Sequence, residues 1–248
     1  RAVSGADAAM ARPPRRNDGT HPVHVLANAV AGDVLFPDDG AFAMFWDALG
    51  ASATAHGVRV GQLCLMSTHY HLLAQGEAEA LAAAIQRAHG KLAWYRNHGD
   101  RRRGTLFARR YAVIPIADPG HLANVVRYIP KNPVKAGLCD GPGAWRWSTH
   151  RALAGLETPP PWFDRADALR IAGFFDSRTY RRFVEAEGHC DDPPLSSEDL
   201  LTYRIRRLAE GGMGDRVIAA SLDISLRRVR AALRDSGIEW HRTCGVLT

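Results

Sequence analysis

The segment from Cys64 to Leu73 constrains the fold of this chain more than any other part of the sequence. It is apolar and aromatic on both sides of Ser67-Thr68, a pattern that predicts two strands joined at that point. Side chains repeat every second residue on a strand, so His69 and His71 would face the same side of a sheet. Neutral imidazole is a common ligand of divalent metals, and two on one face supply half of a small coordination shell. Taken alone, the pair is more simply explained as two histidines on a half-exposed strand.

A second segment, residues 118–138, has the pattern of an amphipathic helix. Asp118-Pro119 is typical of an N-cap and first turn, and apolar residues then recur at helical spacing. Tyr128 and Asn132 are four residues apart, so they would share one helical face and could serve as nucleophile and metal ligand. Taken alone, a buried aromatic and a helix C-cap explain the two residues better. Pro130 lies between them, and a proline inside a helix removes a backbone hydrogen bond and usually kinks the helix.

The order of the predicted elements indicates the fold class. The pattern predicts a strand over residues 23–30, a helix that follows Asp38 and contains Phe42, Phe45, Trp46 and Leu49, two strands around Ser67-Thr68, a helix over 81–97, a strand over 106–116 and the helix that carries Tyr128. This order is a split βαβ pattern on an antiparallel sheet, which is an α+β, ferredoxin-like fold. The histidine strand would be central in that sheet, and the last helix could place Tyr128 against it.

The remainder of the chain is predicted to be helical. After the break at residues 159–161, aromatic residues recur at helical intervals as far as Phe183, among them Phe174 and Phe175, and we interpret them as packing residues. Helices are then predicted over residues 200–209, 215–222 and 225–234, with Asp223-Ile224 as the tight turn of a helix-turn-helix. A plain three-helix packing module explains the same apolar positions. The predicted parts are a basic N-terminal arm (1–20), an α+β domain (21–155), a helical extension and linker (156–195) and an all-α C-terminal module (196–248).

Composition narrows the class of partner. The 248 residues are 46% hydrophobic and carry a formal charge of +6, with an isoelectric point near 9.5, and a basic balance favours nucleic acid or an anionic surface. No apolar run is long enough to predict a membrane span, and residues 1–9 lack the apolar core of a signal peptide. The four cysteines are scattered, which indicates neither a zinc knuckle nor a disulfide framework. A reducing cytoplasm is therefore the expected location.

Four motifs together resemble one family, the single-tyrosine HUH transposases. Residues 66–73 resemble its Met-Pro-Asn-His-hydrophobic-His-Leu-Leu element, and residues 127–138 resemble its nucleophile helix, Arg-Tyr-Ile-x-x-Asn-Pro-Val-Arg-Ala-Gly-Leu. Residues 104–111 are similar to its Gly-x-Leu-Phe-x-x-Arg-Tyr, and residues 145–150 to its Tyr-x-Trp-Ser-Ser-Tyr. The resemblance extends from about Met10 to about Gly188, in family order, and is strongest to the REP-associated tyrosine transposases, bacterial proteins linked to repetitive extragenic palindromes.

The resemblance implies a function and a site. Tyr128 would be the nucleophile, and His69, His71 and Asn132 would hold Mg²⁺ or Mn²⁺. The enzyme would nick and rejoin single-stranded DNA at hairpin-forming palindromes through a 5′-phosphotyrosine intermediate. It would act as a monomer or homodimer associated with the bacterial nucleoid, and it would need neither a membrane nor a nucleotide cofactor.

A set of basic residues is predicted to contact this DNA, because each neutralised phosphate adds affinity. The set comprises Arg15, Arg16, Arg101, Arg102, Arg103, Arg109, Arg110, Arg127, Lys131, Arg227, Arg228 and Arg230. Two other functions remain open from the sequence. One is a hairpin-binding regulator derived from such a transposase that no longer cleaves DNA. The other is a hydrolytic metalloenzyme of the His-x-His barrel type, for which the chain is short.

Overall fold

The computed structural model describes residues 19–31, 33–99, 104–116, 118–186, 205, 214–222 and 224–235, and the chain divides into two compact units, Arg1–Cys190 and Asp191–Thr248. The first unit is built on a four-stranded antiparallel sheet of β1 (Val23–Asn28), β2 (Arg59–Met66), β3 (His69–Gln75) and β4 (Ala112–Pro115). The strand order is β2-β3-β1-β4. The histidine strand β3 is therefore an inner strand, which confirms its predicted central place.

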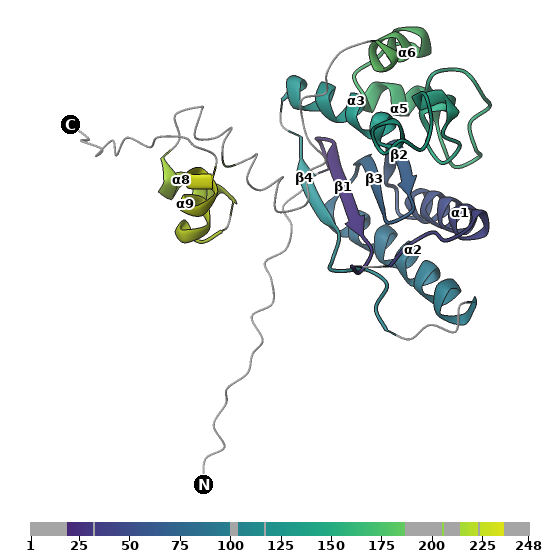
Figure 1. Ribbon diagram of the computed structural model, residues 1–248. Helices are drawn as coiled ribbons and strands as arrows, with labels where there is room; N and C mark the ends of the chain where they lie inside the picture. The colour runs from purple at the N-terminus through teal and green to yellow at the C-terminus, as the bar shows by residue number, and fades with distance from the viewer. Residues whose placement is uncertain are drawn as a thin grey trace. The chain divides into compact units, whose positions relative to one another are not determined.

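The two faces of the sheet carry different side chains. Tyr70 and Leu72 alternate with His69 and His71 along β3, so the apolar pair faces one side and the histidines face the other. The apolar face is covered by α1 (Asp39–Ala55) and α2 (Ala78–Gly99), where Tyr70 packs against Phe45 of α1 with ring centroids 5.2 Å apart. Figure 1 shows α1 and α2 on one face of the sheet, with α3 (Pro119–Lys135), α5 (Arg165–Ile171) and α6 (Ser177–Glu185) on the other.

The histidine face is covered by α3 (Pro119–Lys135), followed by η1 (Pro142–Ala144), α4 (His150–Leu153), α5 (Arg165–Ile171) and α6 (Ser177–Glu185). Asp118 caps α3 as predicted, because its side chain accepts a hydrogen bond from the backbone N–H of His121 at 2.8 Å. The predicted helical extension is present as α5 and α6. Phe174 and Phe183 pack against the core, but Phe175 is 103% exposed, so its prediction as a packing residue was wrong.

The strand predicted over residues 106–116 is shorter than expected. Only Ala112–Pro115 forms a ladder with β1, and Phe107 makes one isolated bridge to Ala29. The ring of Phe107 stacks on His89 of α2, with centroids 3.7 Å apart, and the Arg109-Arg110 pair after it is exposed. Residues 106–108 still bond to the end of β1, with Val30 N–H donating to the Leu106 carbonyl at 3.1 Å and Ala108 N–H to the Asn28 carbonyl at 3.0 Å. The two exposed arginines therefore lie in an irregular stretch between two paired parts, where the alternation of a half-buried strand is broken.

The second unit contains α8 (Asp215–Leu222) and α9 (Leu226–Asp235), close to the helices predicted over 215–222 and 225–234. A small core joins them, made of Ile205, Ile218, Val229, Ala232 and Leu233. Ile205 is the one described residue of the helix predicted over 200–209, and the rest of that prediction lies outside the described residues. Within the described ranges, no helix is both long enough and apolar enough to span a membrane.

Two helical glycines give a matched test of this packing. A Cβ at Gly50 of α1 would overlap the indole of Trp162, whereas a Cβ at Gly90 of α2 would meet no atom within 4 Å. We expect Gly50→Ala to lower the free energy of unfolding by about 1–3 kcal/mol, because overpacking outweighs the gain in helix propensity. Gly90→Ala should raise it by roughly 0.5–1 kcal/mol. Urea denaturation of both variants measures this, and equal effects would contradict the packing at Trp162.

Candidate active site on the histidine face

His71 is the centre of the candidate site. It is buried, and its Nδ1 shares a hydrogen bond of 3.0 Å with Nε2 of His24 on the neighbouring strand β1. Its other ring nitrogen, Nε2, is also buried but has no hydrogen-bond partner among the described residues. Buried polar atoms are normally paired, so an unpartnered imidazole nitrogen suits a site that accepts a ligand.

His69 completes the pair that the sequence predicts. Its ring centroid lies 5.1 Å from that of His71, and its Nδ1 is 3.1 Å from the hydroxyl of Thr68. The ring is only partly buried, in contrast to that of His71. The two imidazoles therefore face the same side of β3, one towards the interior and the other towards solvent.

The histidines of this face are held in their neutral form. Burial lowers the pKa of His24 to about 3, with a smaller contribution from the charge of His121. Burial also lowers the pKa of His71 well below its ordinary value, and to a lesser extent that of His69. A neutral imidazole has a free lone pair and does not repel a cation, so the electrostatics of the face suit metal ligation.

Tyr128 is placed against these histidines by α3. Its ring meets the ring of His71 edge-on with centroids 5.2 Å apart, and it lies 6.3 Å from the ring of His24. Nζ of Lys135, two turns later on the helix, is 5.2 Å from the centre of the tyrosine ring. The predicted position of Tyr128 against the histidine strand is thus present, and a positive charge lies beside it.

Asn132 follows Tyr128 on the same helix and is also buried. Its Nδ2 donates to the carbonyl oxygens of Tyr128 at 2.9 Å and Ile129 at 3.4 Å. The helix runs without a break through Pro130 and Pro133, so neither proline ends it and it is Ala136 that forms the C-cap. The N–H groups of the Asn132 amide are therefore used on the helix itself.

Two basic residues predicted to contact DNA are instead bound to α6 in this structure. Nε of Arg127 donates to the carbonyl oxygen of Phe183 at 3.2 Å, and its guanidinium lies over that ring at 4.2 Å. Nζ of Lys131 donates to the carbonyl oxygen of Ala186 at 3.0 Å. These two side chains therefore attach the C-terminal end of α6 to α3, and any contact with DNA stays a prediction.

The other predicted DNA contacts fall into three groups. Arg109 and Arg110 are exposed next to β4. On α9, Arg227 and Arg228 are exposed, whereas Nε of Arg230 donates to the buried carboxylate of Asp215 at 2.7 Å. Arg15, Arg16, Arg101, Arg102 and Arg103 lie outside the described residues.

Sequence reasoning did not assign His24 or Lys135 to the site. His24 is on β1, and only the register of β1 against β3 brings it to His71, so no local pattern marks it. Lys135 is seven residues after Tyr128, two helical turns, and that spacing is a usable signal for a shared face. Within the described parts of the chain, no three His, Cys, Asp or Glu side chains gather as a metal site.

The comparisons with known proteins bear on the fold. No family model and no curated protein matches this chain. A solved structure of a REP-associated tyrosine transposase bound to a REP hairpin matches 75% of this chain and 96% of its own length, with a TM-score of 0.52 and 14% sequence identity. The two chains share a fold. At this identity the likeness extends to the arrangement of helices and strands and not to individual side chains.

The buried histidines predict a stability that depends on pH. The pKa of His24 and that of His89 are lowered to about 3 by burial, and that of His71 is also strongly lowered. Each histidine takes up a proton on unfolding once the pH falls below the unfolded-state pKa of about 6.5. We therefore expect full stability above neutral pH and a loss of about 1.4 kcal/mol per pH unit for each histidine below that pKa.

Urea denaturation in a chelator, between about pH 7.5 and pH 5, measures this dependence. The His89→Phe variant removes one of these groups and should reduce the slope by about 1.4 kcal/mol per pH unit. A free energy of unfolding that stays constant over this range would show that the histidines are protonated in the folded protein.

Proposed function

We propose that the protein is a metal-dependent enzyme that nicks and rejoins single-stranded DNA at hairpin-forming, REP-like palindromes. The observation that carries the proposal is the unpartnered, buried Nε2 of His71 next to the ring of Tyr128. The shared fold with a hairpin-bound tyrosine transposase adds support, because that protein binds the same class of DNA. Tyr128 is the proposed nucleophile.

His69, His71 and the amide oxygen of Asn132 are the proposed ligands of a Mg²⁺ or Mn²⁺ ion. The fit rests on two observations of this chain: both histidines are kept neutral by burial, and His71 has a buried nitrogen without a partner. If Nε2 of His71 binds the ion, its Nδ1 carries the proton and donates it to Nε2 of His24. When bound, the ion compensates the negative charge of the scissile phosphate.

The reaction proposed for Tyr128 is a transesterification. Its phenol oxygen attacks phosphorus and loses its proton, the bond from phosphorus to the 3′ oxygen breaks, and that oxygen leaves as a hydroxyl after gaining a proton. The product is a 5′-phosphotyrosine, which keeps the energy of the broken bond for rejoining. The Lys135 ammonium lies 5.2 Å from the centre of the ring and favours the negative phenolate that forms when Tyr128 loses its proton.

Exposed arginines of each unit are proposed to contact the DNA. Arg109 and Arg110 leave the sheet next to β4, and Arg227 and Arg228 are exposed on α9. Arginine suits this role because its planar fork matches a phosphate with two hydrogen bonds. Arg230 contributes less in this proposal, since its guanidinium is paired with Asp215.

The Tyr128→Phe variant tests the nucleophile. The wild-type protein, incubated with Mn²⁺ and labelled single-stranded palindromes, should give a covalent product that migrates with the denatured protein. We expect Tyr128→Phe and chelator each to abolish this product, while Tyr128→Phe still binds the hairpin in a gel-shift assay. Binding by the wild type without any covalent product would contradict the enzyme and favour the hairpin-binding regulator.

The proposed metal site predicts an effect of His24 that can be measured without DNA. His24→Leu removes the acceptor that would hold the Nδ1 proton of His71, so it should weaken Mn²⁺ binding by about 10–100-fold. His24→Gln places an amide oxygen near the same position and should restore most of the affinity. Electron paramagnetic resonance titration with Mn²⁺ gives both values. Equal affinity for wild type and His24→Leu would remove His24 from the metal site.

A further inference from the structure

Pro130 interrupts the backbone hydrogen bonding of α3. In an α-helix the N–H of one residue donates to the carbonyl four residues earlier. Pro130 has no N–H, so the carbonyl of Val126 loses its donor from within the helix. Val126 is fully buried, which excludes water as an easy substitute. A buried carbonyl in this position needs another partner.

Gln62 of β2 supplies that partner. Its Nε2 donates to the carbonyl oxygen of Val126 at 3.0 Å. The side chain is 1% exposed, and no hydrogen-bond partner for its Oε1 is found in the described parts of the chain. An amide whose oxygen is left unsatisfied costs free energy in a core, so a purely space-filling role would favour an apolar side chain. The presence of an amide at this buried position is explained by the hydrogen bonds that its N–H groups donate.

A bulge in β2 directs Gln62 to the helix. Val60 pairs with Ala74 and Gln62 pairs with Leu73, so Gly61 is an extra residue between them. Without the extra residue, side chains at 60 and 62 would face the same side of the sheet. With it, Val60 faces the apolar side and Gln62 faces α3, which is the re-aiming effect of a β-bulge.

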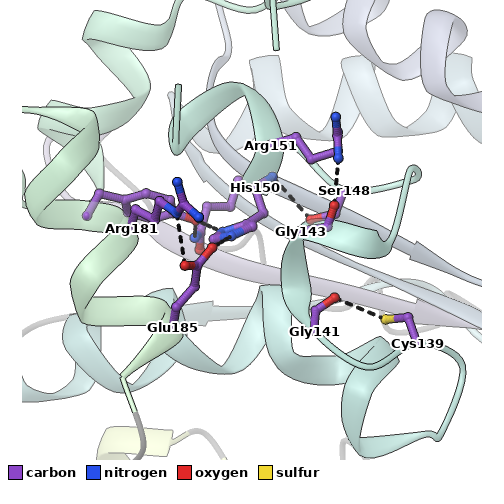
Figure 2. A network of polar contacts seen from close by, with 10 residues as sticks. Cys139, Gly141, Gly143, Ser148, His150, Arg151, Arg181 and Glu185 are labelled. Carbon is purple, nitrogen blue, oxygen red and sulfur yellow. Dashed lines mark hydrogen bonds and ion pairs between the residues drawn. The ribbon is translucent and has the colours of Figure 1, made fainter. Parts of the chain in front are cut away.

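A second set of contacts holds the Gln62 amide in one orientation. Nε2 also donates to the hydroxyl of Tyr180 on α6 at 2.9 Å, and that hydroxyl lies 3.1 Å from Nδ1 of His150. Burial lowers the pKa of His150, so the ring is neutral and one nitrogen accepts while the other donates. Figure 2 shows His150 directed at Glu185, with its Nε2 3.4 Å from the carboxylate, and Arg181 on the same carboxylate at 2.9 Å.

We propose that Gln62 is a positioning residue: it replaces the backbone donor missing at Pro130 and thereby holds the turn of α3 that carries Tyr128 against His71. The carbonyl that Gln62 binds is two residues before Tyr128, and the proline is two residues after it. The inference rests on the proposed function only for the role of Tyr128. The hydrogen bond itself can be tested without cleavage.

A double-mutant cycle between Gln62 and Pro130 is the test. Gln62→Met keeps the approximate volume but removes the donor, and we expect it to lower the rate of covalent product formation by roughly 10²-fold, with hairpin affinity unchanged. Pro130→Ala restores the backbone N–H to the Val126 carbonyl. In that background, Gln62→Met should therefore have little further effect. A loss as large in the Pro130→Ala background as in the wild type would overturn the proposal.

A second readout separates this proposal from the proposed function. The same four proteins are compared by thermal unfolding and by amide hydrogen exchange of residues 126–132. We expect faster exchange around Tyr128 in Gln62→Met and protection restored in the double variant, whether or not the protein cleaves DNA. If no covalent product forms but the exchange cycle shows this rescue, the cleavage function fails and the Gln62 proposal stands. If the effects of Gln62→Met and Pro130→Ala on hydrogen exchange simply add, the Gln62 proposal fails, whatever the outcome of the cleavage assay.

Discussion

The register of β1 against β3 is the constraint on which the rest of the site depends. Leu26 lies opposite His71, and His24 lies two residues earlier on the same face, so the two imidazoles meet across the strands at 3.0 Å. A slip of one residue would turn every side chain of β1 to the other face and place His24 among the apolar residues beneath α1 and α2. The apolar alternation of Val23, Val25 and Ala27 opposes that slip, because these side chains are buried on the other face. The apolar core on one face of the sheet thus fixes which side chains meet on the histidine face.

The histidine face is polar and buried, and such a face is stable only if its groups are satisfied. Two prolines in α3 make the requirement stricter, because each removes a donor from the helix. The structure answers with two side-chain amides: Gln62 takes the carbonyl freed by Pro130, and Asn132 reaches the Ile129 carbonyl freed by Pro133. One amide comes from the sheet and the other from the helix itself. In both cases the amide N–H donates to a backbone carbonyl of α3, and this hydrogen bond fixes the orientation of the amide.

The sequence predicts the features of this site that depend on local periodicity. The shared face of His69 and His71, and the helical face of Tyr128 and Asn132, follow from repeats of two and of about four residues, and neither depends on distant contacts. The contact of His24 with His71 and the turn of Gln62 towards α3 depend on strand register and on a bulge at Gly61. No pattern within β1 or β2 alone predicts this contact or the direction of the Gln62 side chain. The strand predicted over 106–116 failed for a related reason, since Phe107 is held by the ring of His89 on another element.

The basic residues of α3 show the same limit from another direction. Arg127 and Lys131 are spaced as a cationic stripe, and from the sequence a phosphate is their natural partner. In the folded chain their donors meet the carbonyls of Phe183 and Ala186 at the C-terminal end of α6. That end of a helix carries partial negative charge and unpaired carbonyl oxygens, so it attracts the same cations that a phosphate would. Positive charge on a helix therefore indicates a negatively charged or carbonyl-bearing partner, but it does not say whether that partner is a ligand or the chain's own backbone. In this structure the partner of Arg127 and Lys131 is the backbone at the C-terminal end of α6.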